Sequence, residues 1–250
     1  MKINFQNRIN FGWSMPTHVA ITEDALQDNT ALSKVEKRWM AQCSKLPDLI
    51  KEERQDFLAP HFYDALNEDP CFGTVNDEIN NALSRFLMHN KKAMDAAKEG
   101  NRDLFLRETG YAAHYLQDGA TPPHTEHGNY AHKFFRIPMH RLFERGKHIG
   151  TNDRLDILKK NYKYEKLPFA MLAQTFHDIQ RKSQIEELPL NILAGFFHNN
   201  ALFSVQTENQ VRYNNFSKWK GIQQRCFDRS VNSTKAYFEY IMRYIPKAKI

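Results

Sequence analysis

Residues 114–124 have the sequence HYLQDGATPPH, and this stretch decides how the chain folds around a polar site. His114 and Asp118 are four residues apart, so on a helix both side chains lie on one face, about one turn from each other. Two consecutive prolines after them cannot continue the helix. The chain must turn there, which allows His124 to point back toward the same cavity.

The segment HRLFE at residues 140–144 repeats this spacing with His140 and Glu144. Zinc is bound by imidazole and carboxylate donors together, and the two segments supply five such donors. The three cysteines have no CxxC spacing and an odd count, which disfavours a disulfide framework and excludes a Cys-based zinc site. The sequence therefore predicts a metal site made of His, Asp and Glu.

The composition is that of an ordinary globular protein. Of 250 residues, 41% are hydrophobic and 26% are charged, with only 10 glycines and 10 prolines, so we expect one ordered domain. The formal net charge of +6 would attract anionic partners, either phospholipid or nucleic acid. The sequence has no run of about twenty apolar residues, so no membrane span is predicted. The first residues lack the apolar core of a secretory signal.

Apolar residues recur at helical spacing through the chain, with almost no alternation of the kind that strands show. Thr17 is the expected N-cap of the first helix, and Gly100 with Asn101 separates two helices that form a hairpin. We expect an all-α, single-domain helical bundle with ligands projecting inward. The expected helices cover residues 18–29, 31–44, 75–98, 102–119, 138–149, 166–183, 187–206 and 228–244.

Four further candidate ligands precede the helix expected at residues 102–119, which carries His114 and Asp118: Trp13, His18, Asp48 in LPD and His61 in HFYD. Each has an alternative interpretation. His18 could simply occupy the first turn of a helix, Trp13 could be a core residue, and His61 could be a buried structural histidine. Asp48 could be a helix N-cap, a role that is compatible with metal binding. After the proline turn His127 and His132 could also reach a metal, but the spacing from Asp118 favours His124.

The ordered set resembles the bacterial zinc-dependent phospholipase C family, which is structurally related to the S1/P1 nucleases. The resemblance is strongest in HFYD, HYLQDGATPPH and HRLFE, whereas the last hundred residues match only in being helical. It implies an all-α fold that holds three zinc ions. The set consists, in order, of Trp13, His18, Asp48, His61, His114, Asp118, His124, His140 and Glu144.

The resemblance also implies how these residues divide among the three zinc ions. The first zinc would be held by Asp48, His61, His114 and Asp118. Asp118 would bridge it to a second zinc, held by His18 and by the backbone amine and carbonyl of Trp13. The third would be held by His124, His140 and Glu144.

One feature departs from the family, in which the tryptophan is the mature N-terminus and its free amine is a ligand. Here twelve residues precede Trp13. We therefore expect residues 1–12 to be an N-terminal extension that is removed, leaving 13–250 as the catalytic domain. If the extension remained, the second zinc would lose its amine ligand.

The resemblance implies hydrolysis of phospholipid phosphodiester bonds by a metal-activated water, releasing diacylglycerol and a phosphorylated headgroup. Asp48 would orient that water or accept its proton. Glu144 favours the phospholipases, because the nucleases usually have Asp there. The alternative is an S1/P1-type single-strand nuclease, favoured by the short spacing from Trp13 to His18 and by the basic charge. A non-catalytic protein with a structural zinc is disfavoured, because the donors are too many for one closed site.

We further expect a phospholipid substrate at a membrane surface and a monomeric, secreted protein, with a cytoplasmic location as the alternative. Leu49 follows Asp48, where some family members have an aromatic residue, which argues against a choline-type aromatic pocket. Four other histidines have no carboxylate at ligand spacing, so they should be solvent-facing or satisfied core residues: His89, His148, His177 and His198.

Overall fold

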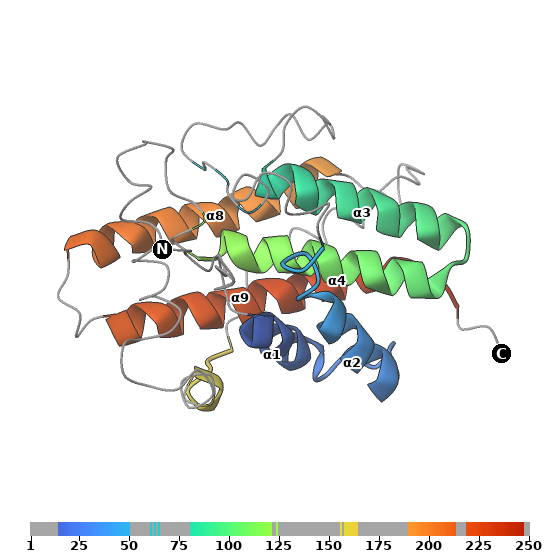
Figure 1. Cartoon of the computed structure of the whole chain (residues 1–250), viewed down its shortest axis with the longest axis horizontal. Helices are drawn as coiled ribbons and strands as arrows, with labels where there is room; N and C mark the ends of the chain where they lie inside the picture. The colour runs from blue at the N-terminus through green and yellow to red at the C-terminus, as the bar shows by residue number, and fades with distance from the viewer. Residues whose placement is uncertain are drawn as a thin grey trace, which may run out of the picture.

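The structure is a computed structural model in which the described residues form helices and no strand (Figure 1), as expected. The described residues are 15–50, 61, 63, 65, 81–121, 124, 156, 158–164, 190–213 and 219–247. The helices are α1 (Met15–Leu26), α2 (Lys34–Cys43), α3 (Ala82–Lys98), α4 (Arg102–Gly119), α8 (Leu190–Tyr213), α9 (Trp219–Ile241) and a 3-10 turn, η6 (Met242–Tyr244).

Helix α4 is the central element of the described bundle. It runs alongside α3, α8 and α9, and the shorter helices α1 and α2 pack against the same bundle (Figure 1). It contacts every other α-helix named above. Every residue from Glu108 to Gly119 is buried. A helix that is enclosed all round must satisfy its polar side chains within the protein, and this requirement shapes the site at its C-terminal end.

The predicted hairpin of α3 and α4 is confirmed, and its turn is a Schellman motif. Gly100 has φ 70, a left-handed conformation that glycine adopts without a Cβ clash. The Asn101 amide donates to the Ala96 carbonyl at 2.8 Å and the Gly100 amide to the Ala97 carbonyl at 3.1 Å. The Asn101 side chain then accepts from the Leu104 amide and caps α4. Two residues thus end one helix and start the next.

Helix α2 packs unusually closely on α4 because α4 carries Gly110 at the contact. A Cβ at this position would lie 2.7 Å from the Cys43 Cβ and 2.9 Å from the Met40 carbonyl oxygen. The close approach places the end of α2, including the Ser44 carbonyl, beside the turn of α4 that carries His114. Gly110 therefore helps to position the site.

Several helix limits differ from those expected. Helix α1 begins at Met15, so Thr17 is a buried residue inside the helix and its prediction as the N-cap is wrong. Helix α2 begins later than expected because Ser33 and Glu36 form a capping box at its N-terminus. Helix α8 ends beyond residue 206, and α9 begins before residue 228. The helices expected at 138–149 and 166–183 lie outside the described residues.

The aromatic stripe expected on the last helix belongs to the core. Tyr237, Tyr240 and Ile241 are buried, and Tyr244 is half-buried at the end of the stripe. Among the described residues, no helix combines the length and the apolar character needed to cross a bilayer.

Replacing Gly110 with alanine tests the close packing of α2 on α4. We expect Gly110→Ala to lower the free energy of unfolding by about 1–3 kcal/mol, because the added methyl overpacks the contact. Gly195→Ala in α8 is the matched control, since a Cβ there meets nothing within 4 Å. In that control the free energy of unfolding should rise by up to about 1 kcal/mol, because alanine has a higher helix propensity than glycine. Urea denaturation measures both, and equal stability of the two variants would contradict the close contact.

The Glu36 carboxylate joins α2 to the start of α4 and should make stability pH-dependent. The hydrogen bond from Arg102 outweighs the effect of partial burial and lowers the pKa of Glu36 from 4.5 to about 2. Arg102 also donates to the Ala31 and Pro246 carbonyls. The carboxylate therefore contributes stability above pH 4.5, and this contribution is lost as the pH falls toward about 2.

We expect Glu36→Gln to cost about 1 kcal/mol near neutral pH, since the pair is partly exposed. The carboxylate accepts from Ser33 through Oε2 and from Arg102 through Oε1. The glutamine has one acceptor oxygen and no charge, so it resembles the protonated carboxyl group, which also has one carbonyl oxygen. Measured by urea denaturation from pH 7 to pH 2, the difference between the natural protein and the variant should shrink toward zero. A difference that stayed constant over this range would contradict the role of the charge.

Candidate metal centre

The last turns of α4 place His114 and Asp118 side by side in the interior. Both side chains are fully buried, and the His114 Nε2 lies 3.2 Å from the Asp118 Oδ2. The spacing of four residues on one helix is the geometry that the sequence predicted.

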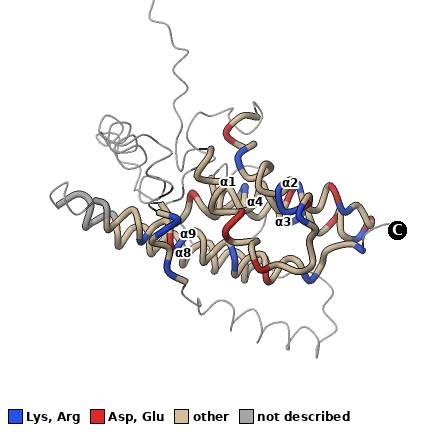
Figure 2. Tube along the Cα trace, turned by 90° about the horizontal axis from the view of Figure 1, so that it is seen from below, with Lys and Arg blue, Asp and Glu red and all other residues tan. Residues whose placement is uncertain are grey.

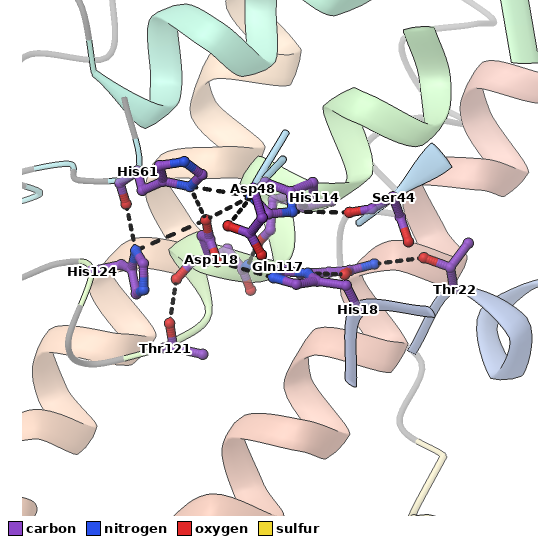
Figure 3. Close-up of polar contacts among 12 residues, drawn as sticks. His18, Thr22, Ser44, Asp48, His61, His114, Gln117, Asp118, Thr121 and His124 are labelled. Carbon is purple, nitrogen blue, oxygen red and sulfur yellow. Dashed lines mark hydrogen bonds and ion pairs between the residues drawn. The ribbon is translucent and has the colours of Figure 1, made fainter. Parts of the chain in front are cut away.

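Three other segments bring candidate ligands to this pair (Figure 3). His18 comes from α1, with its Nε2 3.5 Å from the Asp118 Oδ1. His61 lies with its Nδ1 2.7 Å from the Asp118 Oδ2 and 3.1 Å from the His114 Nε2. Asp48, in the turn after α2, has its Oδ1 3.9 Å from the His114 Nε2. Residues far apart in sequence thus meet around one carboxylate.

Two groups of three donor atoms are close enough to surround a metal ion. One consists of His18, His114 and Asp118, and the other of Asp48, His61 and His114. Within each group the donor atoms all lie within 4.8 Å of one another. The groups share His114, so two ions held by them would be neighbours.

Three donor atoms are buried but have no hydrogen-bond partner among the described residues: His18 Nε2, Asp48 Oδ2 and Asp118 Oδ1. An unsatisfied buried polar atom costs about 1–3 kcal/mol, so a cluster of three needs an explanation. A divalent cation between these atoms would satisfy them, and a mixed nitrogen and oxygen donor set suits zinc. The residues therefore fit the metal that the sequence resemblance implies.

Two of the histidines have their tautomer set by groups outside the cluster. The His114 Nδ1–H donates to the Ser44 carbonyl at 2.9 Å, and the His18 Nδ1–H donates to the Gln117 Oε1 at 2.7 Å. A neutral imidazole held in this way presents its Nε2 lone pair to Asp118. Two lone pairs that face each other are stabilised by a cation between them.

His124 lies beside the cluster without joining either group. Its Nδ1–H donates to the His61 carbonyl at 2.6 Å, and its own carbonyl accepts from the Tyr63 amide at 2.9 Å. Burial lowers the pKa of His124 to about 4, so the ring is neutral near pH 7, the state that metal binding requires. Its Nε2 is the ring nitrogen that would serve as the ligand atom.

Electrostatics keep Asp118 ionised despite its burial. Burial by itself would raise the pKa of this carboxyl, but the surrounding histidines, chiefly His124 and His114, hold it well below its usual range. Burial opposes protonation of His18 and His61, yet their contacts with Asp118 leave both pKa values raised. The pKa of His114 is lowered by burial and by its neighbour His18. The site is organised around one negative charge.

Among the described ligands, only two side chains are exposed to solvent, and only slightly. The side chains of His18, His114, Asp118 and His124 are 0% exposed, whereas His61 is 7% and Asp48 is 9% exposed. Leu49, next to Asp48, is 39% exposed. A substrate would therefore approach the described ligands from the side of Asp48 and His61.

The structure brings six of the nine sequence-predicted site residues together, and the other three, Trp13, His140 and Glu144, lie outside the described residues. The six are His18, Asp48, His61, His114, Asp118 and His124. Sequence reasoning missed Gln117 and the Ser44 carbonyl. Gln117 stands next to Asp118, but its partner His18 is 99 residues away, so no local spacing could identify the pair.

Of the histidines expected to be solvent-facing or satisfied core residues, the two that the structure describes both have a hydrogen-bond partner, and His148 and His177 lie outside the described residues. His89 is buried and pairs through its Nδ1 with the Glu108 Oε2 at 2.8 Å. His198 is half-buried and shares a hydrogen bond of 2.8 Å with the Tyr63 hydroxyl. Glu108 belongs to a different helix from His89, which is why spacing within one helix did not reveal the pair.

Comparison with known proteins finds likeness in structure alone. No protein-family model matches the sequence, and no curated protein sequence matches it. The alpha-toxin of Clostridium perfringens from avian strain SWCP has a similar fold, with a TM-score of 0.65 at 16% identity over 94% of this chain. The alpha-toxin of Clostridium absonum has a TM-score of 0.60 at 15% identity over 98% of this chain. The chain spans 64% and 67% of those two toxin chains. The all-α fold implied by the sequence resemblance is thus confirmed.

Substituting the central carboxylate tests the metal centre directly. We expect Asp118→Asn to abolish stoichiometric zinc binding at both donor groups, because the amide is a much weaker ligand and removes the charge on which the histidines converge. Glu108→Gln is the matched control: it is another buried carboxylate on α4 bonded to a histidine, but it lies outside the cluster. Zinc content after dialysis, measured by atomic emission, should fall only in Asp118→Asn. Equal zinc content in the two variants would contradict the assignment.

Proposed function

We propose that this chain is a zinc-dependent phosphodiester hydrolase, and specifically a phospholipase C that releases diacylglycerol and a phosphorylated headgroup. The observation that carries the proposal is the pair of largely buried donor groups that share His114, with the Asp118 carboxylate of one group 2.7 Å from His61 of the other. Two adjacent metal positions with a carboxylate between them are typical of enzymes that hydrolyse phosphate esters.

Two separate lines support this reading. The order of ligand motifs in the sequence resembles the zinc-dependent phospholipases C. The fold is similar to that of the clostridial alpha-toxins, which are zinc phospholipases C. A shared fold does not by itself imply a shared activity. The agreement gains weight because the predicted ligands on the described helices meet at one place.

The proposed zinc ligands follow the sequence resemblance and fit the distances given above. Asp48, His61, His114 and Asp118 would hold the first zinc, and Asp118 would share the second with His18 and the backbone of Trp13. The third zinc would be held by His124, His140 and Glu144. For that third position, only His124 is among the described residues.

The chemistry proposed is attack of water on phosphorus. Bound zinc ions would acidify the water and neutralise the charge that develops on the phosphoryl oxygens. We assign to Asp48 the role of orienting the water or accepting its proton. In support, its Oδ2 has no hydrogen-bond partner among the described residues, and its side chain is 9% exposed. Asp118 is enclosed by histidines and would serve as a ligand rather than as a base.

A phospholipid fits the described surroundings better than a nucleic acid. The exposed side chain nearest to Asp48 in sequence is the apolar Leu49, which suits a substrate with acyl chains. A single-strand nuclease would need a track of basic side chains along the phosphate backbone. Figure 2 shows Lys and Arg interleaved with Asp and Glu along the described helices, with no such track.

We also propose that residues 1–12 are removed, so that the Trp13 amine becomes free to bind the second zinc, and that the mature enzyme is a secreted monomer. Mass spectrometry of the natural protein should then find Trp13 as its first residue. A fully active enzyme with three zinc ions and an intact Met1 would contradict the processing step.

The activity is tested by incubating the zinc-loaded protein with phosphatidylcholine vesicles and, separately, with single-stranded DNA. We expect release of diacylglycerol and phosphocholine, loss of activity with a chelator and recovery on zinc addition. Asp48→Asn should lower kcat by about 10²-fold or more, the usual effect of losing a general base. The control Asp103→Asn changes an acidic residue in the first turn of α4, outside the site, and should keep full activity. Hydrolysis of DNA alone would replace the phospholipase by the nuclease.

A further inference from the structure

Three of the candidate ligand histidines are held at Nδ1 by a group that is not itself a candidate ligand atom, and they differ in what holds them. His114 donates to the Ser44 carbonyl and His124 to the His61 carbonyl, so both are oriented by the backbone. His18 alone of the three donates to a side chain, the amide of Gln117. A backbone carbonyl is present whatever the residue type, whereas a side-chain acceptor depends on the residue type. Of these three hydrogen bonds, only the one to His18 can therefore be changed by substituting the acceptor residue.

Gln117 is held at both ends of its amide. The side chain is 0% exposed. Its Oε1 accepts from the His18 Nδ1–H at 2.7 Å, and its Nε2 donates to the Thr22 Oγ1 at 2.9 Å (Figure 3). His18 and Thr22 are four residues apart and therefore lie on one face of α1. A single amide from α4 thus reaches across to two successive turns of α1 and fixes its own orientation.

This arrangement decides which nitrogen of His18 faces the metal centre. Because the Nδ1 carries the proton that Gln117 accepts, a neutral His18 has its lone pair on Nε2. That atom lies 3.5 Å from the Asp118 Oδ1, and neither atom has a hydrogen-bond partner in the part of the chain that the structure describes. The group that accepts from the other ring nitrogen of a ligating histidine sets both the tautomer and the basicity of the imidazole.

We propose that Gln117 is a positioning residue for the metal ion held between His18 and Asp118, and that its neutral amide leaves this ion more weakly bound than a carboxylate in the same place would. A carboxylate in the same place would make the imidazole a stronger donor. An amide fixes the tautomer without that gain. The proposal rests on the proposed function, since it presupposes that the cluster binds zinc.

Two substitutions of Gln117 should move zinc affinity in opposite directions. Gln117→Leu removes the acceptor and should weaken binding of the zinc between His18 and Asp118 by about 10–100-fold, the usual effect of losing the group that orients a ligating histidine. Gln117→Glu keeps an acceptor for the His18 Nδ1–H, can accept from the Thr22 hydroxyl and adds charge, so it should tighten that zinc. Calorimetric titration of the metal-free full-length protein with zinc at pH 8 measures both.

Two controls separate positioning from general damage to the fold. Ser204→Ala removes a buried hydrogen bond of 2.8 Å to the Gly119 carbonyl at the end of α4, without touching His18. It should lower the melting temperature and leave both zinc affinities unchanged. In a His18→Ala background, Gln117→Leu should have no further effect on the zinc that remains, because Gln117 acts through His18.

The outcomes distinguish this inference from the proposed function. If the natural protein binds no zinc, the proposed function fails and the inference fails with it. If the natural protein binds at least two zinc ions and Gln117→Leu binds them with the same affinities as the natural protein, the function stands and the positioning role is overturned. An equal loss in the presence and absence of His18 would likewise overturn it, because the effect would then be general.

Discussion

The negative charge of Asp118, fully buried near the end of α4, is the constraint on which the rest of the described structure depends. An ionised carboxylate in the interior is strongly unfavourable unless charged or hydrogen-bonding partners surround it. Here the partners are histidines that come from α1, from α4 itself and from residues 61 and 124. Their convergence on one carboxylate requires helices that are distant in sequence to pack around α4.

The packing that meets this requirement depends on small residues at a few contacts. Gly110 allows α2 to approach α4 so closely that the Ser44 carbonyl can orient His114. At the other end of the motif, a Cβ on Gly119 would lie 3.1 Å from the Phe197 ring of α8. Gly100 lets α3 turn back along α4 within two residues. Backbone geometry and metal-site geometry are therefore linked through particular glycines.

The same arrangement explains how a buried cluster could act on a substrate. Its inner members are completely enclosed, which limits competition from water and strengthens the electrostatic interactions among them. Asp48 and His61 form the part that reaches solvent. The metal-binding function and the substrate-facing function are thus divided between residues of different exposure, although all of them belong to one set of donors.

By itself the sequence determined the helical class, the α3 and α4 hairpin and the His114 and Asp118 pair, because these depend on spacing within about one or two turns. It also indicated His18, Asp48, His61 and His124 as candidates through their order along the chain. Its limits for α1 and α2 were less accurate, since the capping box at Ser33 and the burial of Thr17 depend on local competition and tertiary contacts.

Only the tertiary structure decided which of these candidates meet and what holds them. His61 reaches Asp118 across 57 residues, and His18 reaches Gln117 across 99. No periodicity within a helix encodes a contact of that range, because it depends on how whole helices pack. The tautomer of His18 follows from its contact with Gln117, and that of His114 from the Ser44 carbonyl, 70 residues away. Their donor atoms therefore face Asp118 only once the bundle has closed around it.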